Sequence, residues 1–308
     1  MHFILENLCN LLLIFRSLST EFMKISITVS FLAIVSLVSC SASKKKETRE
    51  LITAFTQYSQ SVKDTFHITV QVPKGYYRNP DKRYPVVVLL DGNFYFPMMS
   101  PVLHQYAMTD MLPPAILVGV GYRSFKIMDS LRNRDYLYPK ALPSDEVKSE
   151  GGGPRFKEYL THELLTKVDA EFRTQKENRI LCGHSFGGYF VLYCLLDQLK
   201  NKSTDFKTFI SASPSLWYND FYLKNIPQEL KKTDEVNNLN IFITVGSKED
   251  STWSVKPVND FTGEIQKLKL KGTKCESRIY NYLEHMDVGV ISFTKGLQEF
   301  LKEDNGTK

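Results

Sequence analysis

One pentapeptide near the middle of the chain, residues 183–187 (GHSFG), restricts the possible folds more than any other stretch. It matches the pattern G-x-S-x-G, in which two glycines permit a sharp, strained turn that exposes a serine hydroxyl to a base. Residues 179–182 have the pattern of a short buried strand, and residues 187–198 that of an apolar helix. The sequence therefore predicts a nucleophile elbow with Ser185 as the nucleophile. The alternative is a glycine-rich turn whose serine has no catalytic role.

The remaining elements predict an α/β fold. Apolar or alternating runs predict strands, helical periodicity predicts helices, and the two kinds alternate, which implies a mainly parallel sheet with helices on both faces. The expected strands lie at residues 66–72, 84–90, 115–120, 206–212, 240–245 and 278–283, and further helices at 155–172, 258–270 and 290–301. Residues 122–154 form a long polar connection of the kind that serves as a lid or pocket wall.

Composition limits the classes of function. A chain of 308 residues is long enough for one large domain, and its net charge of +5 is scattered among acidic residues, so we expect no nucleic-acid partner. Beyond the N-terminal segment only Cys182, Cys194 and Cys275 remain, with no metal-ligand spacing. No nucleotide or flavin motif is present, so the sequence predicts neither a metal nor a cofactor.

The first forty residues differ from the rest. Basic Lys24 precedes an apolar run at 25–35, and the segment closes with LVSC, ending at Cys40. This resembles a bacterial lipoprotein signal, which implies cleavage before Cys40 and its attachment to membrane lipid, with the protein facing the periplasm or cell surface. The alternative, an uncleaved anchor that also uses residues 11–15, would have to bury several charges.

These features divide the chain into four expected segments. Residues 1–40 form the targeting segment, of which 1–22 would precede the true start codon, and the lysine-rich start of residues 41–64 forms a tether and lead-in. Residues 65–303 form the catalytic domain, and 304–308 a C-terminal tail.

Chain order predicts the partners of the serine. In α/β-hydrolases the acid and then the histidine follow the nucleophile, and His285 is the single histidine after Ser185. The strand at 240–245 runs into Glu249 and Asp250, either of which could orient the imidazole; we favour Glu249. The alternative is a Ser-His dyad beside a solvated acidic turn.

The negative charge that develops on the substrate during ester cleavage needs preorganised donors. One is expected from the backbone N–H of Phe186, directly after the nucleophile. The other is expected from the loop after the strand at 84–90, residues 91–93 (DGN).

Together these stretches resemble the “Putative esterase” family of α/β-hydrolases, which includes siderophore esterases, feruloyl and acetyl-xylan esterases and mycolyltransferases. The segments that carry the resemblance are YPVVVLLDGN (84–93), RDY (134–136), GGGPRF (151–156), GHSFGG (183–188), ISASPSLW (210–217), His285 and SFTKGL (292–297). The resemblance implies Ser185 as nucleophile, His285 as base, and oxyanion donors at Asn93 and Phe186.

The expected function is therefore that of a membrane-tethered serine esterase that cleaves a small-molecule or glycan-linked carboxylic ester. Trp217 and Tyr218 could form an aromatic wall for the substrate and Arg134 a clamp, although Trp217 could equally pack in the core and Arg134 could pair with Asp135 or Glu150. Two alternatives use the same fold: an acyltransferase that excludes water, and a catalytically inactive surface binding lipoprotein.

Overall fold

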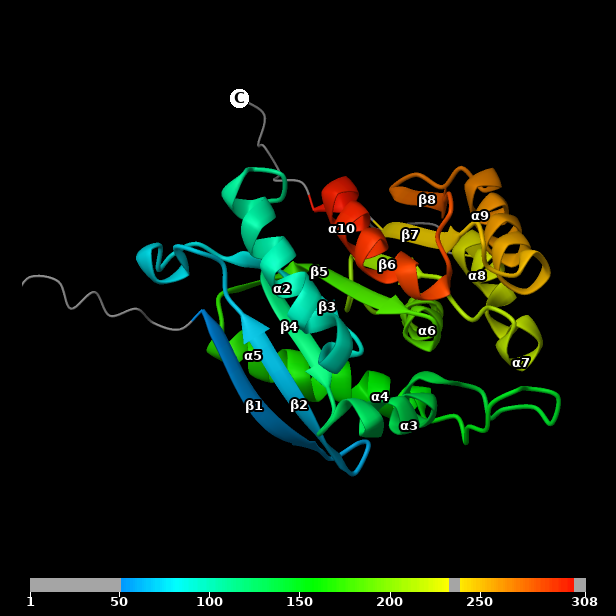
Figure 1. Cartoon of the computed structure of the whole chain (residues 1–308), viewed down its shortest axis with the longest axis horizontal. Helices are drawn as coiled ribbons and strands as arrows, with labels where there is room; N and C mark the ends of the chain where they lie inside the picture. Colours follow the sequence, from blue (N-terminus) through cyan, green and yellow to red (C-terminus); the bar gives the residue numbers. More distant parts are fainter. Residues whose placement is uncertain (1–50, 233–238, 302–308) are drawn as a thin grey trace, which may run out of the picture. The chain divides into compact units, whose positions relative to one another are not determined.

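A mixed sheet forms the centre of the fold in the computed structural model, which describes residues 51–232 and 239–301 (Figure 1). Its eight strands in this part of the chain follow the order β1-β2-β4-β3-β5-β6-β7-β8. Their bounds are β1 (Ile52–Ser59), β2 (Asp64–Gln71), β3 (Tyr84–Leu89), β4 (Ile116–Gly121), β5 (Thr174–His184), β6 (Thr208–Ala212), β7 (Leu239–Gly246) and β8 (Thr273–Tyr280).

Most of the sheet is parallel. β2 pairs antiparallel with both β1 and β4, whereas β4, β3, β5, β6, β7 and β8 pair in parallel along the sheet. Every residue of β4, β6 and β7 is buried, as expected for strands covered on both faces. The predicted α/β-hydrolase fold with a mainly parallel sheet is therefore confirmed.

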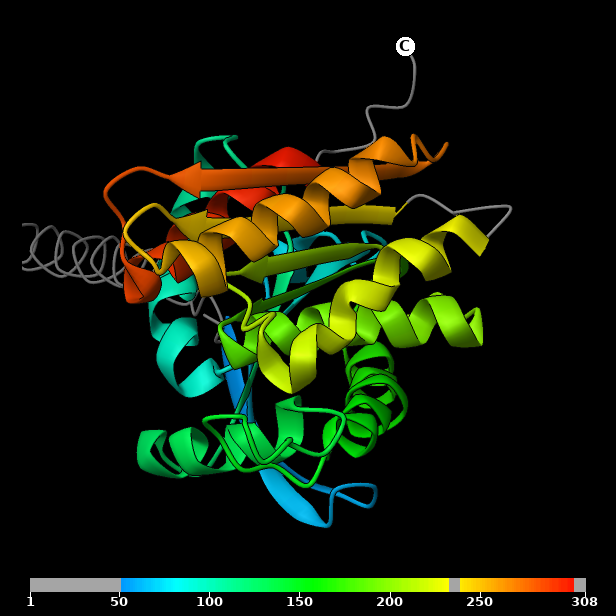
Figure 2. The ribbon, with the colours of Figure 1, turned by 90° about the vertical axis from the view of Figure 1, so that its right-hand side faces the viewer.

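Helices cover both faces of this sheet (Figures 1 and 2). α2 (Gly92–Met108) and α10 (Val288–Phe300) pack together on one face, in the same apolar cluster as Val87 and Leu89. Val86 and Val88 point to the other face, because successive strand residues alternate. That face is covered by α4 (Gly153–Glu158), the π-helical η2 (Tyr159–Leu164), α5 (Leu165–Glu171), α6 (Phe186–Asn201), α8 (Ile226–Lys232) and α9 (Lys256–Lys267).

Two expected connections contain regular structure. Residues 122–154 include α3 (Phe125–Tyr136), which begins where the Ser124 hydroxyl accepts a hydrogen bond from the Ile127 N–H. Its polar composition hides the helical pattern. The expected lead-in, 41–64, contains the edge strand β1, so the sheet begins earlier than expected. The last strand ends at Tyr280, three residues before the predicted end.

The targeting segment 1–40, with Cys40, and the tail 304–308 lie outside the described residues. Within the described ranges, none of the helices combines the length and the apolar character needed to cross a membrane.

Candidate active site

The serine of the G-x-S-x-G motif lies at the turn between β5 and α6. Ser185 has φ 59° and ψ −120°, a conformation that is rare for a residue with a side chain and costs about 1–3 kcal/mol. The turn requires glycine on both sides: a Cβ on Gly183 would lie 2.3 Å from the Gly187 carbonyl oxygen, and one on Gly188, the glycine directly after the motif, would lie 2.8 Å from the Ala212 oxygen. The motif thus permits a backbone path that places Ser185 at the carboxyl end of β5.

Backbone hydrogen bonds hold this turn in place. The Ser185 N–H donates to the carbonyl oxygen of Ala212 at the end of β6, over 3.0 Å. The Ser185 carbonyl oxygen accepts from the N–H of Tyr189 at 2.9 Å and from that of Ser215 at 3.3 Å. The strained conformation is therefore fixed by the neighbouring strand, by α6 and by the loop after β6.

Glu249 and His285 form a hydrogen-bonded pair at the ends of neighbouring strands. His285 Nδ1 lies 2.8 Å from Glu249 Oε2, and the other carboxylate oxygen accepts from the Ser213 hydroxyl at 2.6 Å and the Gly246 N–H at 2.7 Å. The Glu249 side chain is only 3 % exposed. Burial raises its pKa, but the hydrogen bonds from His285, Ser213 and Gly246 outweigh burial, and the net pKa is lowered. The carboxylate thus favours the imidazole tautomer with the proton on Nδ1, which leaves Nε2 as the acceptor.

Asp250 has a different structural position. Its carboxylate accepts hydrogen bonds from the backbone N–H groups of Thr252 and Trp253, both at 2.8 Å, and so caps the π-helical η4 (Ser251–Val255). Of the two adjacent carboxylates, the structure brings Glu249 to His285 and uses Asp250 as a helix cap.

His184, the residue before Ser185, joins the nucleophile strand to the histidine loop. Its Nε2 lies 2.7 Å from the His285 carbonyl oxygen, and the two rings are 4.5 Å apart. Burial, followed by the charge of His285, lowers the pKa of His184 to about 4. His184 is therefore neutral near pH 7, and its Nε2 donates to His285. This contact places the histidine directly beside the elbow.

A buried ion pair beneath the elbow was not expected from the sequence. Arg132 on α3 donates from Nε and Nη2 to both oxygens of Asp91, at 3.0 and 2.8 Å, and also to the His184 carbonyl oxygen at 3.1 Å. The side chains are 14 % and 4 % exposed. Asp91 itself has φ 51° and begins the turn into α2. The pair therefore ties α3, α2 and the end of β5 together. The sequence did not predict it, because Arg132 is one of several charged residues in a polar stretch.

The two expected oxyanion donors lie in the first turns of helices. Phe186 is the first residue of α6 and Asn93 the second of α2, so their N–H groups precede the first intrahelical hydrogen bond. The Asn93 side chain bonds both the carbonyl oxygen and the N–H of Tyr122, at 2.8 and 2.6 Å. This contact fixes the start of α2 against the end of β4.

The three residues expected to bind substrate differ in position. Trp217 is half-buried and its ring contacts that of Phe186, with centroids 6.0 Å apart. Tyr218 is fully buried and donates to the Pro139 carbonyl oxygen at 2.7 Å, because α7 (Tyr218–Phe221) turns it toward the core. Its side chain therefore packs in the core and lines neither of the two cavities described below, in contrast to the expected aromatic wall.

The guanidinium of Arg134 is likewise occupied. It pairs in bidentate fashion with buried Asp135, at 2.7 and 2.9 Å, and reaches Asp64 at 2.8 Å. Arg134 is thus part of a structural ion pair and not a free clamp for the substrate. This agrees with the alternative that it pairs with Asp135.

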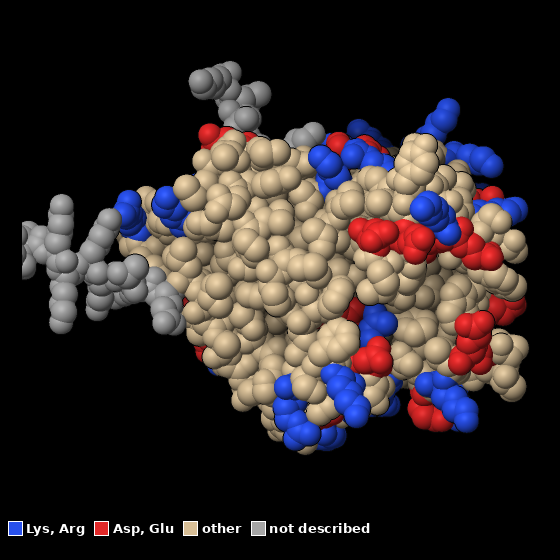
Figure 3. Space-filling model, viewed as in Figure 1, with Lys and Arg blue, Asp and Glu red and all other residues tan. Residues whose placement is uncertain are grey.

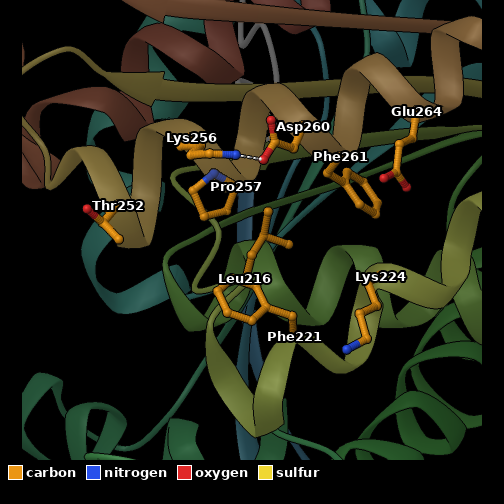
Figure 4. Close-up of a pocket in the computed structure, with 9 residues that line it drawn as sticks. All are labelled: Leu216, Phe221, Lys224, Thr252, Lys256, Pro257, Asp260, Phe261 and Glu264. Atoms are coloured by element: carbon orange, nitrogen blue, oxygen red, sulfur yellow. Dashed lines mark hydrogen bonds and ion pairs between the residues drawn. The ribbon is translucent and has the colours of Figure 1, made fainter.

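Two cavities lie beside the loops that follow β6 and β7. The first, of about 390 Å³, is lined by Ser144, Asp145, Glu146, Trp217, Asp220, Phe221 and Trp253. The second, of about 300 Å³, is lined by Leu216, Phe221, Lys224, Thr252, Lys256, Pro257, Asp260, Phe261 and Glu264 (Figure 4). Phe221 is common to both linings. Among the described residues, no group of three His, Cys, Asp or Glu side chains is arranged to hold a metal ion.

The chain belongs to the “Putative esterase” family, whose sequence pattern matches residues 59–289. It is 28% identical over 263 residues to the ferri-bacillibactin esterase BesA of Bacillus subtilis (strain 168), a match that covers 80% of this chain and 88% of that protein. It is 31% identical over 164 residues to the apo-salmochelin esterase of Escherichia coli O6:H1, which covers 51% of this chain and 49% of that protein.

Solved structures agree with this assignment. The BES protein from Bacillus cereus superposes with a TM-score of 0.70 and 25% identity, covering 84% of this chain and 99% of that one. An IroE-like serine hydrolase from Shewanella oneidensis superposes with a TM-score of 0.69 and 25% identity, covering 81% and 80%. The chain is thus an esterase of the α/β-hydrolase superfamily, an enzyme class that hydrolyses ester bonds.

Proposed function

We propose that this protein is a serine esterase that works through an acyl-enzyme, with Ser185, His285 and Glu249 as its catalytic triad. The observation that carries the proposal is the hydrogen bond of 2.8 Å between His285 and Glu249, beside a serine in the strained elbow conformation. A nucleophile, a base and a group that orients the base are the arrangement that activates a serine hydroxyl.

In the first half of the reaction the Ser185 oxygen attacks the ester carbonyl carbon while His285 Nε2 takes the hydroxyl proton. The backbone N–H groups of Phe186 and Asn93 stabilise the resulting oxyanion. When the tetrahedral intermediate collapses, the ester C–O bond breaks and His285 returns the proton to the leaving alcohol. Glu249 stabilises the imidazolium that exists between these proton transfers.

In the second half a water molecule attacks the acyl-serine. His285 takes a proton from the water, a second oxyanion forms on the same donors, and its collapse returns that proton to Ser185. The products are the carboxylic acid and the free enzyme, so one water is consumed for each ester bond.

The names of the relatives favour a siderophore-type ester as substrate. BesA is a ferri-bacillibactin esterase, and the matched protein from E. coli is an apo-salmochelin esterase. We propose the same substrate class here. Activity measured on a panel of siderophore, feruloyl, acetyl and simple acyl esters tests this proposal.

We further propose that the enzyme is held at the cell envelope by a lipid on Cys40. The motif LVSC after an apolar run supports this, and the two acyl chains of a diacylglyceryl group suffice for stable anchoring. Cys40→Ser should release the protein from the membrane fraction or leave it unprocessed. Wild-type protein that is soluble and retains Met1 would contradict the anchor.

The catalytic assignment is tested by covalent labelling. A fluorophosphonate probe should label the wild-type protein at Ser185 and leave Ser185→Ala unlabelled, as read by mass spectrometry. His285→Ala should lower kcat by about 10⁶-fold, because no other group supplies the base. Labelling that persists in Ser185→Ala, or full activity in His285→Ala, would refute the mechanism.

A further inference from the structure

The cavity of about 390 Å³ beside the active site has an unusual lining. Three aromatic residues, Trp217, Phe221 and Trp253, and three carboxylate residues, Asp145, Glu146 and Asp220, account for six of its seven lining residues; the seventh is Ser144. The lining contains no lysine or arginine. Aromatic faces and carboxylates both attract cations, and together they form the surroundings in which proteins bind ammonium groups.

The neighbouring cavity provides an internal comparison. Its lining carries two lysines and two carboxylates, and on α9 Lys256 is paired with Asp260 (Figure 4). Charge is therefore balanced there and unbalanced in the first cavity. In Figure 3 acidic and basic side chains both lie on the right-hand side, where Figure 1 places α7 and α9, whereas a wide area over α2 has no charged side chains.

The carboxylates are only partly neutralised by neighbours. Within residues 51–232 and 239–301, Glu146 has neither a hydrogen-bond nor an ion-pair partner, and Asp220 has a loose pair with Lys224 at 3.8 Å. Asp145 accepts hydrogen bonds from the N–H groups of Leu142, at 2.7 Å, and Asn219, at 3.1 Å, which satisfy its oxygens but leave its charge uncompensated.

The cavity is lined by neighbours of the catalytic residues, although Ser185, His285 and Glu249 are not themselves part of its lining. Trp217 contacts Phe186, the residue after the nucleophile, and Trp253 lies on η4, the turn that Asp250 caps directly after Glu249. Phe221 stacks on Trp253 with a ring-to-ring angle of 12°. These two links, to the residue after Ser185 and to the turn after Glu249, are the reason for assigning the cavity to the substrate of the same reaction.

One side of the cavity, the segment 219–221, has a fixed conformation. Asn219, Asp220 and Phe221 have φ of 50°, 50° and 56°, in the left-handed region that costs about 1–2 kcal/mol for each residue with a side chain. The Asn219 side chain donates to the Lys140 carbonyl oxygen at 2.8 Å and its N–H to Asp145, so the segment is tied to the opposite loop. These hydrogen bonds thus hold the segment that carries Asp220 and Phe221 against Asp145 before any ligand arrives.

We infer that this cavity is a substrate subsite that selects esters carrying an ammonium group. The inference deepens the proposed esterase function by narrowing its siderophore-type substrates to esters with an ammonium group at this position, and it rests on that function for the kinetic test alone. The acidic lining would repel an anionic group at the same position. The affinity of this subsite should therefore be highest for cationic groups, lower for neutral groups and lowest for anionic groups.

A binding experiment tests the subsite without catalysis. Trp217 and Trp253 are the two tryptophans of the chain, so intrinsic tryptophan fluorescence reports on this cavity. The Ser185→Ala protein is titrated with choline and with its uncharged isostere, 3,3-dimethyl-1-butanol. We expect choline to bind at least about tenfold more tightly, a preference that added salt reduces.

Charge-removing variants locate the effect. Combining Glu146→Gln with Asp220→Asn should bring the two affinities to within about threefold, since the remaining attraction comes from the rings and Asp145. Glu150→Gln is the matched control, because Glu150 lies in the same loop but pairs with Lys140 and does not line the cavity. Equal affinities in Ser185→Ala, or a preference that survives in the double variant, would overturn the inference.

A kinetic experiment separates this inference from the proposed function. One pair of esters places the charge on the alcohol: the butyrate esters of choline and of 3,3-dimethyl-1-butanol. The other places it on the acyl chain: the p-nitrophenyl esters of 5-(trimethylammonio)pentanoic and 6,6-dimethylheptanoic acids. We expect kcat/KM to be about tenfold higher for the charged member of at least one pair. If both pairs are hydrolysed and neither pair shows a preference for the charged member, the subsite is refuted and the esterase function is supported. If choline binds selectively but no ester is hydrolysed, the subsite is supported and the esterase function is refuted.

Discussion

The active site has a floor and a rim that are built differently. The floor comprises His184, Ser185, His285, Glu249, Asp91 and Arg132, and hydrogen bonds from several elements hold its side chains or backbone. The rim, which lines the first cavity, is more exposed; Trp253 is 54 % exposed. Groups that must meet within hydrogen-bond distance need a rigid surrounding, whereas groups that choose among substrates can change at little cost to the fold. The comparison predicts large effects at the floor and small effects on stability at the rim.

The largest expected effect separates the two adjacent carboxylates at the floor. Glu249→Ala should lower kcat by about 10⁴-fold, because the imidazole loses both its orienting partner and the charge that stabilises its protonated form. Asp250→Ala should change kcat by less than about threefold and cost about 1 kcal/mol of unfolding free energy through the lost helix cap. Steady-state kinetics and urea unfolding measure both. Two mild effects on kcat would instead indicate a Ser-His dyad.

The next effect concerns the stability of the floor. Arg132→Met should lower the unfolding free energy by about 3–5 kcal/mol, because Asp91 would remain buried without its partner. Lys140→Met is the matched control: its pair with Glu150 is mostly exposed, and its loss should cost at most about 1 kcal/mol. Urea unfolding measures both variants, and similar losses would show that the floor is no more tightly constructed than the surface.

A pH effect of about 3 kcal/mol should also originate at the floor. The folded-state pKa of His184 is about 4, below its ordinary value of about 6.5, so between these pH values the unfolded chain binds a proton that the folded chain does not. Stability should therefore fall as the pH falls from about 6.5 to 4. His184→Gln should flatten this part of the curve when unfolding free energy is measured at several pH values. The loss linked to Glu249 appears only below its ordinary pKa, so parallel curves for the two proteins would disprove the role of His184.

The smallest expected effect is at the rim. Trp253→Leu should change the unfolding free energy by less than about 1 kcal/mol, since the ring is 54 % exposed and buries little apolar area. Thermal or urea unfolding measures this. A loss of more than about 2 kcal/mol would place Trp253 in the core and would remove the distinction between floor and rim.

The parts of the site that the sequence predicts are those set by local pattern or chain order. The glycines around Ser185 specify the elbow because steric exclusion acts within a few residues, and the order of elements identifies His285. The sequence favours Glu249 over Asp250 without a local pattern that distinguishes them, because the choice depends on which way a turn directs two successive side chains. The pair of Arg132 with Asp91 spans 41 residues and has no local signature.

The fold shows the same division. Buried parallel strands such as β4 and β7 are apolar throughout and are predicted from composition alone. β1 is an exposed edge strand, and the mostly polar α3 was hidden within a long connection, so both were missed. Tyr218 was expected beside Trp217 in an aromatic wall for the substrate, but the direction of a side chain after a strand depends on the tertiary path of the loop.

The contact between His184 and the His285 carbonyl oxygen joins residues that are 101 positions apart. During synthesis the elbow strand leaves the ribosome well before the loop that carries His285, so this contact and the pair with Glu249 cannot form until the C-terminal part of the chain has been made. A prematurely terminated chain would contain the strained serine without its histidine. Completion of the chain and assembly of the site are thus coupled by topology, and truncated products of this gene would lack the reactive arrangement.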